Sequence, residues 1–306
     1  MKVKPLQVPL GLTAIIICCM IVNSPHVATG LPAELVARIG GNATGVYFPL
    51  YNLEELPQVL AAKKEFPSVP FDVNINPASG PGDAPMADWT SAIVKLRNAG
   101  AVVTAYVPTG YGTERNVTDV EGMILSYSKF YPKMLDGIMF DEVSGSCSKF
   151  SFYKTLADYA RSVGYSYLRA NVGGPLCQDE ITLFNQVAIY EGSGYPSQTL
   201  LESRTLHSRY PKDVVGFSAT IHTAPLYDSS WLSMAQKYLK WIYITDQAEP
   251  NPYAMPPSYL ERYLADLSSS KINLQPAPEF GPYVTMVLLI SITAIIVTTM
   301  KLARHA

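Results

Sequence analysis

The feature that most constrains the fold is a repeat of eight short runs rich in β-branched and aromatic residues, spaced by roughly 20–35 residues. The runs occupy 44–51, 71–77, 101–108, 135–142, 165–173, 186–192, 213–220 and 240–246. Helix-like stretches separate them, and strand–helix alternation gives a parallel sheet because each parallel return needs a crossover. Eight such units fit the usual length of a closed (β/α)₈ barrel. The sequence therefore predicts an α/β fold with a single TIM-type barrel domain.

Three of the intervening stretches show helix signals directly. We predict helices over 87–100, 151–164 and 256–267. The first two end at a glycine, the common residue just past a helix C-terminus, and the third starts with two prolines, which suit a first turn. The alternative is an open doubly wound sheet. No G-x-G-x-x-G follows the first run, so a nucleotide-binding version of that sheet lacks support.

The two ends of the chain differ from its middle. Residues 1–30 begin with basic residues, continue with an apolar stretch and end with small residues. This order predicts a signal peptide or, as the alternative, an uncleaved N-terminal anchor. Residues 283–300 carry no charge and predict a transmembrane helix, joined by a linker over 271–282. The basic tail 301–306 favours a cytoplasmic C-terminus. We expect the domain over 31–270 to be exported and held at the cell surface by the cytoplasmic membrane.

Charge and cysteine usage fit an exported domain. The net charge is −2 and no basic stripe occurs, so nucleic acid is not an expected partner. Of four cysteines, the pair at 18–19 lies in the apolar start, and Cys147 and Cys177 remain. An even pair in an exported protein predicts a disulfide, with two buried free thiols as the alternative. Asn42 and Asn116 each begin a glycosylation triplet.

Acidic residues near the ends of the fourth and sixth runs are the candidate catalytic groups. Asp141 and Glu142 end the fourth run, and Glu191 is the last residue but one of the sixth. In a (β/α)₈ barrel the chemistry sits at the carboxyl ends of the strands. Since successive strand residues point to opposite faces, one of Asp141 and Glu142 should line the mouth and the other should start the loop. Glu191 would face that pair across the mouth.

This arrangement of carboxylates is typical of glycoside hydrolysis. One carboxylic acid protonates the leaving oxygen, and a second carboxylate attacks the sugar or activates water. A third carboxylate nearby would raise the pKa of one partner through like charge. Tyrosines at the strand ends and in the loops, including Tyr51, Tyr106 and Tyr111, offer flat faces with a polar tip to a sugar ring. We expect a polysaccharide substrate and no cofactor.

Two other functions remain open at this point. A non-catalytic carbohydrate-binding or cell-envelope protein could use the same barrel. A metal-dependent hydrolase could use the three carboxylates as oxygen ligands, but no clustered His/Cys pattern occurs, and we predict no metal site. The oligomeric state stays open.

Several motifs in a fixed order resemble one family. "NPASGPG", "AYVPTGYGTER" and "GIMFDE" within residues 44–265 are similar to the spherulin-4-type (spherulation-specific) family. The resemblance implies a (β/α)₈ fold and an endo-acting glycoside hydrolase of galactosamine-containing matrix polysaccharide. Its motif residues map onto Asp141, Glu142 and Glu191 as acidic residues, and onto Asn76, Tyr106, Thr109, Tyr111 and Asn171 as further site positions. Val-Gly-Gly follows Asn171 where the family has Pro-Gly, so sugar and linkage stay open. "PEFG" at 278–281 resembles an archaeal C-terminal sorting signal, which implies a processed tail.

Overall fold

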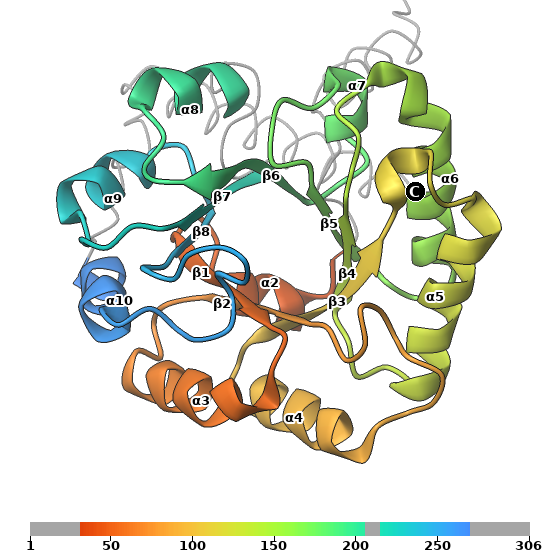
Figure 1. The fold of residues 1–306 in the computed structure, drawn as a ribbon. Coiled ribbons are helices and arrows are strands. Elements are labelled where there is room, and N and C mark those ends of the chain that lie inside the picture. Colours follow the sequence, from red (N-terminus) through yellow and green to blue (C-terminus); the bar gives the residue numbers. More distant parts are fainter. Residues whose placement is uncertain (1–30, 206–214, 270–306) are drawn as a thin grey trace, which may run out of the picture. The chain divides into compact units, whose positions relative to one another are not determined.

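The computed structural model describes residues 31–205 and 215–269. Within them, eight parallel strands close into a barrel in the order β1 to β8, and β8 pairs back onto β1 (Figure 1). The predicted (β/α)₈ barrel is confirmed, and the open-sheet alternative is wrong. The strands are β1 Gly45–Leu50, β2 Phe71–Ile75, β3 Val102–Pro108, β4 Gly137–Asp141, β5 Tyr167–Asn171, β6 Gln186–Ser193, β7 Gly216–His222 and β8 Trp241–Ile244.

Helices surround the strands on the outside of the barrel (Figure 1). Those described are α2 Ala33–Ile39, α3 Leu56–Glu65, α4 Ala87–Asn98, α5 Val117–Phe130, α6 Phe150–Ser162, α7 Gln178–Ile181, α8 Gln198–Thr205, α9 Ser229–Ala235 and α10 Leu260–Ser269. The predicted start of the last helix at 256 is wrong, because a residue before proline is biased away from helical geometry and Pro256 precedes Pro257.

Both predicted end segments lie outside the described residues. Among the helices that the structure describes, none is long and apolar enough to cross a membrane.

Capping side chains fix where two helices begin. Asn116 Oδ1 accepts a hydrogen bond from the Asp119 backbone N–H at 2.9 Å, and Asp228 Oδ1 accepts one from the Trp231 N–H at 2.9 Å. Each satisfies a backbone donor that the first helical turn leaves free, and such a cap contributes about 1 kcal/mol. The caps set the entry of α5 and α9 on the outside of the sheet.

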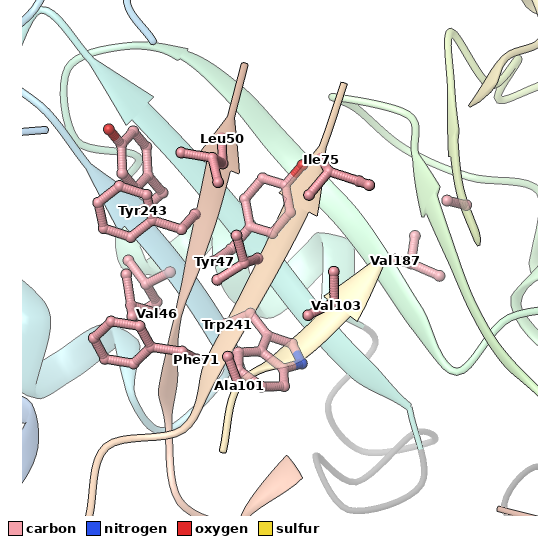
Figure 2. Close-up of a cluster of buried hydrophobic side chains, with 14 of the residues drawn as sticks. Val46, Tyr47, Leu50, Phe71, Ile75, Ala101, Val103, Val187, Trp241 and Tyr243 are labelled. Atoms are coloured by element: carbon pink, nitrogen blue, oxygen red, sulfur yellow. The ribbon is translucent and has the colours of Figure 1, made fainter. Parts of the chain in front are cut away.

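The strands are buried on both faces, so they read as continuous apolar runs rather than alternating ones. All six residues of β1 are buried. Figure 2 shows apolar side chains gathered around β1 and its neighbours, among them Val46, Leu50, Phe71 and Tyr243. This packing holds the barrel wall in one shape.

Helix α2 covers the amino ends of the strands. Leu35 packs with Val102 and Tyr167 in a small buried cluster. Arg38 donates to both carboxylate oxygens of Asp136, which directly precedes β4, at 2.6 and 2.5 Å. These contacts close the barrel at the amino ends of its strands, opposite the end where the predicted site residues lie.

A buried polar layer fills the barrel below the predicted site. Arg169 on β5 and Asp72 on β2 form an ion pair with 3.8 Å between Nη1 and Oδ2. The Arg169 guanidinium carbon lies 3.2 Å from the ring centroid of Tyr47. Burial raises the pKa of Asp72 to about 6, opposed by the charge of Arg169. Arg169 lies two residues before Asn171, so the two side chains are on the same face of β5.

A second buried carboxyl makes folding stability depend on pH. Glu55 is only 4% exposed, and neither carboxyl oxygen has a hydrogen-bond partner among the described residues. Burial raises its pKa from 4.5 to about 8. Because the folded state favours the protonated form, the stability that Glu55 contributes is present below pH 4.5 and lost as the pH rises through about 8.

We expect the Glu55→Gln variant to remove this part of the pH dependence, because glutamine carries no titrating proton. Its Tm should fall less than that of the wild type between pH 4.5 and about 8. The matched control is Glu54→Gln, on the exposed neighbour, which should keep the wild-type slope. Thermal unfolding followed by circular dichroism measures both. Equal slopes for Glu55→Gln and the wild type would contradict the account.

Candidate active site

One side-chain amide bridges two of the three predicted catalytic carboxylates. Asn171 Nδ2 donates to Asp141 Oδ1 at 2.8 Å and to Glu191 Oε2 at 2.7 Å. Asn171 is the last residue of β5, which pairs with β4 on one side and β6 on the other. Barrel closure therefore brings Asp141, Asn171 and Glu191 together at the carboxyl ends of three adjacent strands.

An irregularity in β6 turns Glu191 toward this site. The register against β7 shifts between Ala188 and Tyr190: Ala188 pairs with Ser218, and Glu191 pairs with Thr220. An advance of three residues along β6 thus matches an advance of two residues along β7. One extra residue in one strand of a pair is the definition of a β-bulge. Ser218 faces the barrel interior, where its hydroxyl accepts from Arg169. The bulge places Glu191 on the same face, whereas strict alternation from Ala188 would have turned it outward.

The surroundings of Asp141 shift the pKa of its carboxyl group. Burial raises its pKa, and the charge of Glu191 raises it further. Hydrogen bonds from Asn171 and Tyr106 act in the opposite direction. Asp141 therefore keeps its proton to a higher pH than an ordinary aspartic acid, which suits a group that donates a proton.

Glu142 lies one residue beyond β4 and differs from Asp141 in its contacts. Its φ of 55° is in the left-handed region, which is uncommon for a residue with a side chain. Its Oε2 accepts a hydrogen bond from the Gly110 N–H at 3.0 Å. The two adjacent residues therefore have different environments: Asp141 contacts β5, and Glu142 contacts the loop after β3.

Three predicted aromatic residues lie around the carboxylates. The rings of Tyr51 and Tyr106 meet edge to face, with 5.9 Å between centroids. Tyr106 hydrogen-bonds Asp141. Tyr111 is 51% exposed, and Glu142, Asp141 and Glu191 all raise the pKa of its hydroxyl in addition to the effect of burial. Together these rings form an aromatic wall beside the carboxylates.

Tyr253 belongs to the site and was missed in the sequence. Its hydroxyl donates to Glu191 Oε1, and its ring meets Tyr51 edge to face with 6.0 Å between centroids. It lies in the segment between β8 and α10, several residues past the strand end. Inspection of strand ends alone could not find it; the rule that whole βα loops build barrel sites could have.

Asn76 is the predicted site residue that the structure does not bring to the carboxylate pair. Its Oδ1 accepts a hydrogen bond from the Gly80 N–H at 2.9 Å, and the hydrogen bond described for its side chain lies within its own loop. An asparagine that accepts from a nearby backbone N–H stabilises a turn. Asn76 therefore shapes the loop after β2.

The predicted disulfide is confirmed, and the alternative of two free thiols is wrong. Cys147 and Cys177 are bonded, with 5.0 Å between their Cα atoms. The bond joins the segment after β4 to the segment after β5. Those are the strands that end in Asp141 and Asn171, so the disulfide restrains the rim next to the site.

The metal-dependent alternative gains no support from the described residues. The Asn171 side-chain amide N–H groups point at the nearest oxygens of Asp141 and Glu191. A cation shared by these two carboxylates would instead need oxygen ligands around it. In the ranges 31–205 and 215–269, no group of three or more His, Cys, Asp or Glu side chains is arranged to hold a metal ion.

Fold and site together define the class: a (β/α)₈ barrel in which carboxylates from two strands meet at the carboxyl ends of the strands. The chain belongs to the spherulation-specific family 4, whose family model matches residues 46–267. Over 122 residues it is 36% identical to Spherulin-4 of Physarum polycephalum. That match covers 39% of this chain and 36% of the relative, so it spans about a third of that protein's length.

Solved structures share the fold. Aspergillus clavatus Sph3, determined in complex with GalNAc, superposes with a TM-score of 0.64 at 22% identity, covering 76% of this chain and 99% of that chain. A Thermomonospora fusca β-mannanase in complex with mannotriose gives a TM-score of 0.52 at 12% identity, covering 74% of this chain and 91% of that chain. Both are barrels of this type, and at these identities the likeness concerns the fold.

We expect Asn171→Leu to raise the pKa of Asp141, because leucine has a similar size and no N–H to hydrogen-bond the ionised carboxylate. A ¹³C NMR titration of the aspartate carboxyl carbons measures the shift. Asn76→Leu is the matched control and should leave the titration of Asp141 in place. A titration that stays unchanged or moves to lower pH in Asn171→Leu would contradict the role of this bridge.

Proposed function

We propose that this protein is a glycoside hydrolase that cleaves amino-sugar polysaccharide of the galactosamine type at internal bonds. The observation that carries the proposal is the bridged pair of Asp141 and Glu191 at the barrel mouth. Two carboxyl groups on either side of the scissile bond are what this reaction requires. Hydrogen bonds with Asn171, Tyr106 and Tyr253 hold both groups in fixed positions.

In the proposed reaction, Asp141 is the acid and Glu191 is the nucleophile. Asp141 has the raised pKa and gives its proton to the glycosidic oxygen as that bond breaks. Both oxygens of Glu191 accept hydrogen bonds, from Asn171 and Tyr253, and these contacts hold the carboxylate in place for attack. One Glu191 oxygen forms an ester with the anomeric carbon. Asp141, now ionised, takes a proton from the water that hydrolyses this ester.

The separation of the pair favours this two-step route. Asp141 Oδ1 and Glu191 Oε2 both accept from Asn171 Nδ2, at 2.8 and 2.7 Å. The distance between these two oxygens therefore cannot exceed the sum of the two hydrogen-bond lengths. That limit falls at the upper end of the about 5–5.5 Å typical of retaining enzymes and below the ~6.5 Å at which inverting enzymes begin. We therefore propose retention of the anomeric configuration.

The proposed substrate class has separate support. Aspergillus clavatus Sph3 was solved in complex with GalNAc, and the likeness to that protein covers 76% of this chain. Tyr51, Tyr106 and Tyr111 supply aromatic faces beside the carboxylates. A protein that only binds carbohydrate on this barrel is the rival function. We also propose that the domain acts outside the cell, tethered by the end segments; the disulfide fits an oxidising compartment.

Asp141→Asn and Glu191→Gln should each lower kcat/KM by at least about 10³-fold on a galactosamine-type polymer, because each removes one half of the carboxylate pair. Binding of the polymer should be retained. Reducing ends released from acetylated and deacetylated polymer measure cleavage, and calorimetry measures binding. The matched control is Asp119→Asn on the exposed face of α5. Variants that still cleave, or a wild type that binds the polymer without cleaving it, would overturn the proposal.

A further inference from the structure

The loop after β3 contains a strained turn next to the carboxylates. Gly110, Tyr111 and Gly112 have φ values of 57°, 54° and 63°, so three consecutive residues are in the left-handed region. Glycine adopts this region without a steric cost, but Tyr111 does so at about 1–2 kcal/mol. Other contacts must therefore hold the tyrosine in place.

Glu142 supplies most of those contacts. Its Oε2 accepts from the Gly110 N–H at 3.0 Å, and its backbone carbonyl accepts from the Tyr111 N–H at 2.8 Å. The Thr109 hydroxyl donates to the same carbonyl at 2.8 Å. Glu142 is itself left-handed, with a φ of 55°, which turns both its carbonyl and its carboxylate toward the turn. Lys149 Nζ adds a hydrogen bond to the Gly112 carbonyl at 2.8 Å.

We call these contacts of Glu142 and Lys149 with the turn the clamp. The turn that the clamp holds presents the ring of Tyr111 at the barrel mouth. Tyr111 is a large hydrophobic side chain that is half exposed, at 51%. The Tyr111 N–H donates to the carbonyl of Glu142, which directly follows Asp141, so the turn lies next to the proposed catalytic pair. Strained backbone held by surrounding contacts clusters at ligand sites, where it presents a side chain in advance of binding.

We propose that Glu142 is a positioning residue that holds Tyr111 as a stacking platform for a sugar unit of the polymer beside the bond that is cleaved. Its carboxylate accepts the hydrogen bond of the Gly110 N–H, whereas Asp141 transfers the proton and Glu191 attacks the sugar. This inference rests on the proposed function for its kinetic consequences. The clamp and the platform can also be tested without activity.

A double-mutant cycle tests the kinetic consequence. Tyr111→Ala and Glu142→Ala should each raise KM about five- to tenfold, with kcat reduced no more than about threefold, since a lost ring contact weakens binding by that order. The double variant should match either single variant within about twofold, because both changes remove one platform. Glu142→Gln, which keeps an oxygen acceptor for Gly110, should recover most of the lost KM.

Glu114→Ala is the control, a neighbouring exposed carboxylate outside the clamp. A loss of kcat in Glu142→Gln as large as that in Asp141→Asn would make Glu142 catalytic and overturn the inference. The inference would also be overturned if the rise in KM of the double variant equalled the product of the rises in Tyr111→Ala and Glu142→Ala.

Two measurements keep the test independent of cleavage. Hydrogen exchange of the Gly110 and Tyr111 amides should be faster in Glu142→Ala than in the wild type, and close to the wild type in Glu142→Gln. Calorimetry with a galactosamine oligosaccharide should show weaker binding to Tyr111→Ala. A wild type without cleavage would overturn the hydrolase function alone, whereas unchanged exchange or unchanged binding would overturn the platform.

Discussion

The hydrogen-bonded bridge from Asn171 to Asp141 and Glu191 is the interaction on which the site depends. It exists because β4, β5 and β6 lie side by side in a closed barrel, so their carboxyl ends meet. The buried ion pair of Arg169 and Asp72 lies one layer below. Buried ion pairs add little net stability, but they fix geometry when both partners are satisfied. The arrangement favours a site with little freedom to rearrange before substrate arrives.

Two departures from regular backbone give the site its chemistry. The bulge in β6 turns Glu191 inward, and the left-handed geometry of Glu142 turns that residue toward the loop after β3. As a result, Glu142 has a different hydrogen-bond partner from the other two carboxylates. Asp141 and Glu191 share an amide donor, and Glu142 holds a backbone N–H. Division of labour among like side chains follows from their environments, as it does in other carboxylate pairs.

The repeat of apolar runs was sufficient to predict the barrel, because parallel strands buried on both faces are nearly continuous apolar runs that alternate with helices. The position of strand ends was sufficient to select Asp141, Glu142 and Glu191. It was not sufficient to find Tyr253, whose contact with Glu191 depends on the path of a loop. Asn76 matches a family motif, but its side chain is engaged within its own turn. Bulges and loop paths depend on tertiary packing, which short-range patterns do not encode.

The central claim is that Asp141 and Glu191 act as a closely spaced pair. The most direct test is the anomeric configuration of the product first released from a galactosamine-type polymer, followed by ¹H NMR before mutarotation. The geometry predicts that the new reducing end keeps the configuration of the bond that was cleaved. An inverted product would require room for a water molecule between acid and base, and it would contradict the account.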